Sequence, residues 1–442
     1  MSKLLLTFYG DDFTGSTDAL EQLTLAGIRT ALFVEPPTPA QLKKFPDLQA
    51  IGVAGKTRSL VPAAMERELK PALLALKRLK PRHVHYKVCS TFDSSPTIGS
   101  IGNVMDVAAK IFRTPFIPLL VAAPALGRYT IFGQHFARYG IGSAGAIHRL
   151  DRHPSISKHP VTPMTEADLR LHLAKQTKKI IALFDILKFS LPEKEFHAAF
   201  RQLLAEKPDV VLFDALTAEH IARFGTVLES AARKSSPLFS VGSSGIESAL
   251  ATVLEKRTTV RAFGMAAKQI LVVSGSCSPV TGGQISRALK NGFAEVDFNF
   301  QKLATDPTGE INRVCRAANE LLQKGRSVVV FTAKRGVSKS VPKKMKDNPA
   351  MWLGTALGIV AQSALKKKLV HRVCIAGGDT SSYAGRALGI QALEMIAPLT
   401  PGAPLCRAHA PGRPADGCEM VFKGGQVGPE NYFEIVKLGK NL

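Results

Sequence analysis

Residues 3–18 read KLLLTFYGDDFTGSTD, and this stretch decides the fold that we expect. The apolar run that ends at Phe8 predicts a short buried strand, and the leucine spacing that follows predicts a helix over residues 16–26. Two adjacent carboxylates, Asp11 and Asp12, are therefore expected in the tight turn between a first strand and a first helix.

This first turn is a candidate site. In an open α/β sheet, ligands bind at the carboxyl ends of the strands. Adjacent like charges repel, which favours a hydrogen-bonded, metal-bound or proton-accepting role for Asp11 or Asp12. The alternative is that one of them only caps the helix and that Gly15 relieves the turn.

Strand-like runs alternate with amphipathic stretches along the whole chain, which predicts βαβ units and a largely parallel sheet. The chain of 442 residues is too long for one ordinary core. The alternation weakens across 255–267 and restarts at 269, so we place a domain boundary near residue 260. We expect an α/β protein with two domains, 1–260 and 261–442, each a mostly parallel sheet flanked by helices. The expected strands are 29–34, 50–54, 83–88, 116–122, 179–184, 209–214, 237–241, 269–273, 294–299, 327–332, 372–376 and 419–422.

The composition narrows the class of partner. A net charge of +23 suits either nucleic acid or anionic small molecules. The basic residues are spread out, with local clusters only at 366–368 and at Lys343, Lys344 and Lys346, and no zinc finger or RNA-binding aromatic motif occurs. We therefore expect no nucleic-acid partner. The absence of a long apolar run predicts no membrane partner, and six scattered cysteines without metal-ligand spacing predict reduced thiols in the cytoplasm.

Three turns rich in glycine or serine each follow a predicted strand of the second domain. Hydroxyls and backbone N–H groups at a helix N-terminus form an anion site, and paired glycines let a ligand approach the backbone. Simple helix capping is the alternative for each turn alone. Together the turns predict a nucleotide cradle, in which Asp379 would hold Mg²⁺ through water. The candidate residues are Ser274, Ser276, Ser278, Gly377, Gly378, Asp379, Thr380, Gly424 and Gly425.

A further candidate site lies at the end of the fourth expected strand, in the sequence YKVCSTFDSS. Lys87 is a point charge that suits a carboxylate or a phosphate, although a surface lysine would look the same. Ser90 and Thr91 can donate to the same anion, and Asp93 can orient them or bind a sugar hydroxyl. Arg58 follows the third strand in a similar way. The Pro- and Gly-rich region 401–417 predicts a long active-site loop or flap.

Five segments in this order resemble the four-carbon acid sugar kinase family, which includes 3-oxotetronate and threonate kinases. The resemblance covers nearly the whole chain. Two segments depart from the family pattern: GSIGN replaces the usual GNIGP at 99–103, and KGGQVG replaces KSGNFG at 423–428. The first departure leaves the identity of the acid open. The matching segments are 10–18, 86–93, 159–165, 274–278 and 377–381.

The resemblance implies ATP-dependent phosphorylation of a four-carbon sugar acid in carbohydrate catabolism. The acid would bind to the N-terminal domain and ATP with Mg²⁺ to the C-terminal domain, with the active site in the interdomain cleft. Asp11 or Asp12 would accept the proton of the reacting hydroxyl or orient that hydroxyl. The basic and hydroxyl residues at the ends of the third and fourth strands would hold the rest of the acid.

Other functions stay open on the sequence alone. One is a kinase of a different small hydroxy acid. Another is a dehydrogenase, against which the absence of a GxGxxG motif after the first strand counts. A third is a non-catalytic protein that binds nucleotide or nucleic acid. The number of subunits is also open, with a homodimer among the alternatives.

Overall fold

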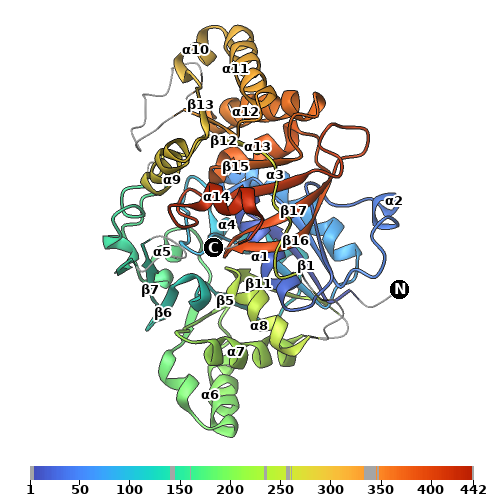
Figure 1. Ribbon diagram of the computed structural model, residues 1–442. Coiled ribbons are helices and arrows are strands. Elements are labelled where there is room, and N and C mark those ends of the chain that lie inside the picture. The colour runs from blue at the N-terminus through green and yellow to red at the C-terminus, as the bar shows by residue number, and fades with distance from the viewer. Residues whose placement is uncertain are drawn as a thin grey trace. The chain divides into compact units, whose positions relative to one another are not determined.

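The computed structural model describes residues 4–139, 145–159, 161–232, 236–254, 259, 261–332, 345 and 348–440, and its chain divides into two compact units (Figure 1). The first unit contains most of the chain up to residue 259, and the second contains residues 31–34 and the described chain from 261 onward. Residue 260, our predicted boundary, lies outside the described residues. Lys343, Lys344, Lys346 and Pro160 lie outside them too.

The first unit is built on a sheet of parallel strands in the order β3-β1-β4-β11-β5-β10-β9. Each strand coincides with a run that the sequence predicted, so the α/β class is confirmed. Their bounds are β1 (Leu6–Gly10), β3 (Ala50–Ala54), β4 (His83–Lys87), β5 (Ile117–Leu120), β9 (Ile181–Phe184), β10 (Val210–Phe213) and β11 (Leu238–Gly242).

Helices cover both faces of this sheet. On one side α1 (Phe13–Leu25), α7 (Ala218–Ala231) and α8 (Gly245–Val253) pack together, and on the other α3 (Pro62–Arg78) packs against α4 (Ile101–Ile111), which contacts α5 (Leu169–Ala174). Helix α6 (Glu193–Ala205) packs on the outer strand β9.

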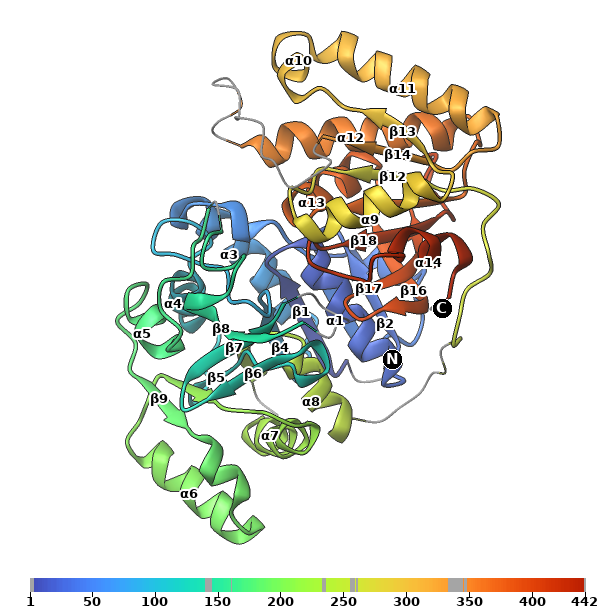
Figure 2. The ribbon, with the colours of Figure 1, turned by 60° about the vertical axis from the view of Figure 1, so that its left-hand side comes forward.

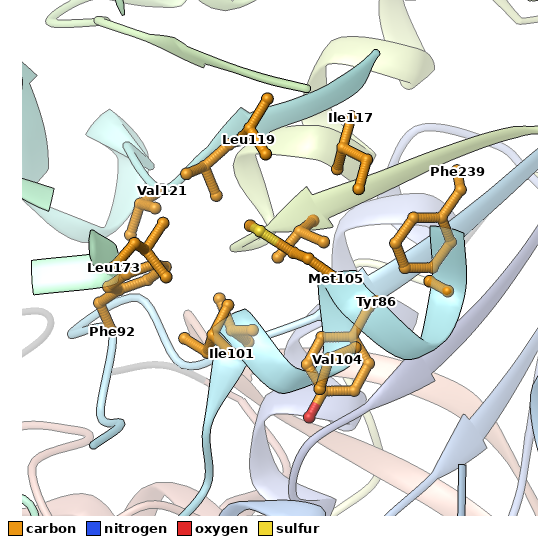
Figure 3. Close-up of a cluster of buried hydrophobic side chains, with 14 of the residues drawn as sticks. Tyr86, Phe92, Ile101, Val104, Met105, Ile117, Leu119, Val121, Leu173 and Phe239 are labelled. Carbon is orange, nitrogen blue, oxygen red and sulfur yellow. The ribbon is translucent and has the colours of Figure 1, made fainter. Parts of the chain in front are cut away.

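The core between the sheet and α4 is made of large apolar side chains. Figure 3 shows α4 against strands β4, β5 and β11, with Tyr86, Ile101, Val104, Met105, Ile117, Leu119 and Phe239 in the cluster. Tyr86 also stacks on Tyr9 of β1, with ring centroids 6.2 Å apart. Because side chains alternate along a strand, the neighbours of Tyr86 on β4, His85 and Lys87, point to the opposite face, toward α1 and α8.

A small antiparallel sheet, which the sequence did not predict, is attached to the first unit. It consists of β6 (Arg128–Ile131), β7 (Gln134–Arg138) and β8 (Ile147–Arg149), shown in teal in Figure 2. His135 of β7 is buried, and its Nε2 lies 2.9 Å from the carbonyl oxygen of Ser90. This contact connects the small sheet to the turn that follows β4.

The second unit has a mixed sheet in the order β13-β14-β12-β15-β18-β17-β16-β2. The first five strands in this order, β13, β14, β12, β15 and β18, are parallel to one another. The last three pairs, β18 with β17, β17 with β16 and β16 with β2, are antiparallel. Strand β2 comes from the N-terminal part of the chain. The bounds are β2 (Thr30–Phe33), β12 (Leu271–Ser274), β13 (Ala294–Asp297), β14 (Val328–Phe331), β15 (Arg372–Ala376), β16 (Ala392–Thr400), β17 (Ala403–His409) and β18 (Glu419–Lys423).

Helices also cover both faces of the second sheet. On one side α11 (Pro307–Gln323), α12 (Pro349–Lys366) and α13 (Gly378–Ala387) pack against one another, with α10 (Phe300–Thr305) on α11. On the other side α9 (Pro279–Lys290) packs against α14 (Tyr432–Leu438) (Figure 2). Among the helices that the structure describes, none combines the length and the apolar character that a membrane crossing requires.

The prediction of a flap over 401–417 is wrong. Residues 403–409 form β17, which pairs with both β16 and β18, and the hairpin turn before it contains Gly402 with a φ of 85°. Gly402 lies in the hairpin turn, and Pro404 lies near the start of β17, where proline is tolerated. The prediction treated the whole stretch as a loop because of its proline and glycine, although it contains β17, a strand that is mostly buried.

Candidate functional site

The first turn places Asp11 and Asp12 in different roles. Asp12 is the N-cap of α1, and its Oδ1 accepts a hydrogen bond of 2.7 Å from the N–H of Gly15. Its Oδ2 accepts from the hydroxyl of Thr14 at 2.7 Å and lies 2.8 Å from the guanidinium of Arg58. Asp12 therefore caps the helix, and Arg58 is already paired with its carboxylate.

Asp11 has spare bonding capacity. The carboxyl is buried, its Oδ2 accepts only a bond of 3.2 Å from the N–H of Cys89, and its Oδ1 has no hydrogen bond. Burial raises the pKa of Asp11 to about 7, and the charge of Asp12 adds to the rise, whereas Arg58 and Lys87 oppose it. A carboxyl with a pKa near neutral can hold or release a proton at physiological pH.

Lys87 is buried beside this carboxyl. Its Nζ lies 3.2 Å from Oδ2 of Asp18 and donates to the carbonyl of Val88 at 3.1 Å, so it is not the surface lysine of the alternative reading. Burial alone would lower the pKa of Lys87, but the charges of Asp18, Glu247 and Asp11 raise it above its ordinary value. The ammonium therefore stays charged.

Gly15 carries no side chain beside these groups. A Cβ at this position would lie 3.5 Å from Nζ of Lys87, 3.7 Å from Oδ1 of Asp11 and 2.7 Å from Oδ1 of Asp12, so glycine lets all three approach the helix backbone. A hydroxyl that reached the unpartnered Oδ1 of Asp11 beside Lys87 would meet a proton acceptor and a cation together. This geometry suits the abstraction of a proton from an alcohol.

The turn after β4 lies next to Asp11. The N–H of Cys89 binds Asp11, and the hydroxyl of Thr91 donates to Oδ1 of Asp93 at 3.0 Å. Ser90 is buried, with its carbonyl held by His135. Asp93 therefore orients a neighbouring hydroxyl, one of the two roles predicted for it.

Several buried polar groups of this unit were missed by the sequence reasoning. Glu247, in the first turn of α8, is fully buried, and burial raises its pKa to about 8 while the charge of Lys87 opposes the rise. Its Oε1 lies 3.5 Å from Nε2 of His85, whose own pKa burial lowers to about 3. Asp18 and His153 were given no role either, and Arg128 was noted only as a basic residue after the fifth expected strand. Such groups have no local motif, because their neighbours come from distant parts of the chain.

In the second unit, the three predicted turns meet at one edge of the sheet. Strands β12, β15 and β18 are adjacent and parallel, so their carboxyl ends lie together. A Cβ at Gly425 would lie 3.0 Å from the hydroxyl of Ser276 and 3.0 Å from Cβ of Ser278. A Cβ at Gly377, whose φ is 136°, would collide with the hydroxyl of Thr380. Glycine is needed at both positions for the turns to approach one another.

This edge presents groups suited to an anion. The hydroxyl oxygens of Ser278 and Thr380 are buried without a hydrogen bond. Helices α9 and α13 begin here, and neither N-cap residue, Ser278 or Gly377, supplies a side-chain cap. Uncapped N–H groups and the positive end of each helix attract phosphate.

Lys423, at the end of β18, is a cation that our site prediction left out. It is fully buried, donates to the hydroxyl of Thr281 at 2.9 Å, and has no carboxylate within ion-pair distance among the described residues. Burial lowers the pKa of Lys423 to about 7. The hydroxyl of Thr281 donates in turn to the carbonyl of Gly425 at 2.9 Å, which ties Lys423 to the third turn.

The described residues offer few ligands for a metal ion. No three His, Cys, Asp or Glu side chains come together as a metal site within the described part of the chain. Asp379 supplies one carboxylate in the first turn of α13, beside Thr380. One carboxylate suits Mg²⁺ that arrives bound to phosphates, because this ion keeps several waters and needs few protein ligands.

Comparison with known proteins identifies the family. Residues 6–250 match the model of a sugar-binding N-terminal domain, and residues 271–433 match that of a nucleotide-binding C-terminal domain. The chain is 40% identical to a 3-oxo-isoapionate kinase of Paraburkholderia graminis, over 99% of this chain and 95% of the relative. It is 28% identical to a 3-oxo-tetronate kinase of Pseudomonas savastanoi pv. phaseolicola, over 97% of this chain and 96% of the relative. The chain belongs to the four-carbon acid sugar kinase family, as its motifs predicted.

Solved structures agree on the fold. A Salmonella typhimurium LT2 protein described as a putative tRNA synthase superposes with a TM-score of 0.76 at 23% identity, over 98% of this chain and 99% of that one. A Haemophilus influenzae protein gives a TM-score of 0.67 at 21% identity, with coverage of 98% and 99%. These likenesses concern the architecture alone.

Proposed function

We propose that this protein is an ATP-dependent kinase that phosphorylates a hydroxyl of a 3-oxo sugar acid. The observation that carries the proposal is the first turn, where an unpartnered oxygen of Asp11 and the ammonium of Lys87 both lie next to Gly15. The 40% identity to a 3-oxo-isoapionate kinase favours 3-oxo-isoapionate as the substrate over the 3-oxo-tetronate named for a relative that is 28% identical.

The reaction begins with the hydroxyl of the acid seated between Asp11 and Lys87. Asp11 accepts the hydroxyl proton as the oxygen attacks the γ-phosphorus of ATP, and the bond to the β-phosphate oxygen breaks in line. Lys87 stabilises the charge near the attacking oxygen, and Asp12 holds the turn and Arg58 in place. Ser90, Thr91 and Asp93 contact the remaining hydroxyls of the acid.

ATP is assigned to the edge of the second sheet. Ser274, Ser276 and Ser278, the glycines of the turns at 377–378 and 424–425, and Thr380 surround the phosphates, and Lys423 adds positive charge. Asp379 would hold Mg²⁺ through water, and the ion would supply positive charge to the phosphates. All six cysteines are free thiols, which supports a cytoplasmic location.

The deciding experiment measures ADP release from Mg·ATP with a panel of acids. The panel contains 3-oxo-isoapionate, the 3-oxotetronates, and D- and L-threonate and erythronate. We expect turnover with a 3-oxo acid and much slower turnover with the reduced acids. Turnover of a reduced acid alone would reject the 3-oxo assignment, and no ADP release with any member would reject the sugar-acid kinase itself.

A further inference from the structure

The cations nearest to Asp11 are already neutralised. Arg58 lies 2.8 Å from Asp12, and Lys87 lies 3.2 Å from Asp18. Both were predicted to hold the carboxylate of the acid, but each already has a buried carboxylate as its partner. A charged carboxylate needs a cation or strong donors when it leaves water, so its anchor must be sought elsewhere in the unit.

Arg128 is a buried guanidinium with unused donors. It is 3% exposed, and its Nη1 donates to three backbone carbonyls, those of Leu126, Gly127 and Arg138, at 3.1, 3.4 and 2.9 Å. Its Nε is buried and has no hydrogen bond, and Arg128 forms no ion pair with any carboxylate that the structure describes. The Nε–Nη2 edge of a guanidinium is one that binds a carboxylate with two parallel bonds.

His153 offers a second unused donor. It is 1% exposed, and its Nδ1 accepts from the N–H groups of Ser155 and Ile156 at 3.2 and 3.3 Å. Burial, followed by the charges of Arg128 and His148, lowers the pKa of His153 to about 4, so the ring is neutral at pH 7. Because Nδ1 accepts, the ring proton lies on Nε2, and this atom is buried without a hydrogen bond.

The two donors lie in one neighbourhood next to the turn after β4. The carbonyl of Arg138 accepts from Arg128 and lies near the ring of His153, which stacks on Tyr139 with ring centroids 5.7 Å apart. His135 of the same small sheet lies 2.9 Å from the carbonyl oxygen of Ser90. The sheet that carries Arg128 therefore adjoins the turn that contains Ser90 and Thr91, the residues assigned to the acid.

We propose that Arg128 and His153 form the subsite that binds the carboxylate of the sugar-acid substrate. This inference rests on the proposed function, because it assigns the anionic end of the acid whose hydroxyl Asp11 deprotonates. The guanidinium supplies charge and two donors, and the imidazole supplies a neutral N–H. The subsite explains how two buried donors can remain without partners in the free protein.

The test compares an acid with its uncharged counterpart. The ketotetrose erythrulose is 3-oxotetronate with a CH₂OH group in place of the carboxylate, and the same pair can be made for any acid that the panel identifies. Wild-type enzyme should prefer the acid in kcat/KM. Arg128→Met should raise KM for the acid about 10- to 100-fold, the range for loss of a charge-assisted hydrogen bond, and leave turnover of the ketose unchanged. Binding of ATP, measured by direct titration, should not change.

Two further variants protect the test against misfolding. His153→Asn keeps an acceptor near the Nδ1 position and removes the Nε2 donor, and should raise KM for the acid about 3- to 10-fold. Arg149→Met is the control, because Arg149 lies on the same small sheet and is already paired with Asp151 at 2.6 Å. It should leave the preference for the acid as in wild type.

The outcomes separate the two proposals. Equal losses for acid and ketose in Arg128→Met or His153→Asn would mean a structural role only and would overturn the subsite. If Arg128→Met does not fold, an unchanged acid preference in His153→Asn overturns it. Failure of the wild-type enzyme to phosphorylate any acid would reject the function. In that case, acid binding that is detectable in titrations and lost in His153→Asn would still support the subsite, and its absence would overturn it.

Discussion

The backbone N–H of Asp11 donates a hydrogen bond of 2.8 Å to the carbonyl oxygen of Lys87. This bond continues the pairing of β1 and β4 one residue beyond the Gly10–Lys87 register. The acid and the cation that we place at the reacting hydroxyl are thus fixed through the main chain of two adjacent strands. A substitution of either side chain should therefore change the chemistry and leave the sheet intact.

Replacement of Asp11 by asparagine should remove the base. We expect Asp11→Asn to lower kcat by about 10²- to 10⁴-fold, the usual contribution of a general base, with a melting temperature at least equal to that of wild type. Asp12→Ala serves as a contrast, because the loss of an N-cap should cost about 1 kcal/mol of stability. Activity near the wild-type level in Asp11→Asn would show that another group is the base.

The pH profile provides an independent test of the same residue. Asp11 must be deprotonated to accept a proton, and its pKa is raised to about 7 by burial and by Asp12. The rate at subsaturating acid should rise about tenfold per pH unit below pH 7 and level off above it. This rise should vanish in Asp11→Asn, whereas a wild-type profile that is flat between pH 5.5 and 8 would contradict the assignment.

Glycine at position 15 should be required for the substrate hydroxyl to approach Asp11. In Gly15→Ala the new methyl group lies 3.5 Å from Nζ of Lys87 and 2.7 Å from Oδ1 of Asp12, so it crowds both groups and strains the cap. We expect kcat/KM for the acid to fall at least 100-fold, with ATP affinity unchanged in a direct titration. Gly283→Ala is the matched control, because a Cβ at this helical glycine meets only side-chain atoms of Glu430 at 3.8 Å. Equal kinetics in the two variants would show that the substrate hydroxyl does not bind near Gly15.

Much of this arrangement was predictable from sequence, because it depends on local order. A strand, a polar turn and a helix follow one another at Asp11, at Ser274 and at Gly377, and parallel strands bring such turns to one edge. The roles of the two aspartates were not predictable, because only the fold shows that Asp12 meets Arg58 and that one oxygen of Asp11 meets nothing.

Other features depend on contacts between distant segments and leave no local signal. Glu247 looks like an ordinary acidic residue in the first turn of a helix, yet it is buried beside His85. Arg128 is the first residue of the small sheet and His153 follows its last strand, and these strands are short and only partly buried. Strand β17 was not predicted for a different reason: the stretch around it is rich in proline and glycine, as loops are.

Lys423 should couple ATP binding to a proton. Burial lowers its pKa to about 7, so about half of the side chains are neutral at pH 7, and nearby phosphate favours the charged form. ATP should bind with proton uptake near pH 7 and more weakly at pH 8 than at pH 6. Calorimetry in buffers with different ionisation enthalpies measures the uptake. Lys423→Met should abolish it, with Lys290→Met as the control; uptake that persists in Lys423→Met would exclude this lysine.

Glu247 should make the protein less stable as the pH rises. Its pKa is raised to about 8 in the folded state by burial, above the ordinary value near 4.5, so the folded state binds more protons than the unfolded state over this interval. Stability is therefore lost from about pH 4.5 to pH 8, by up to about 1.4 kcal/mol per pH unit. The gain in melting temperature of Glu247→Gln over wild type should grow between pH 5.5 and pH 8. A gain independent of pH would show that this carboxyl titrates normally.

Strand β2 limits where the chain can be cut into separate domains. Residues 31–34 are synthesised early, but they pair with β16 and belong to the unit whose other strands come from the last 170 residues or so. A fragment cut from the chain near residue 260 would lack this strand, and β16 would have an unpaired edge prone to association with other chains. During synthesis the second unit cannot complete its sheet from newly made residues alone. Division of the gene between the regions matched by the two family models would thus separate a strand from its sheet, so the two regions have to be inherited together.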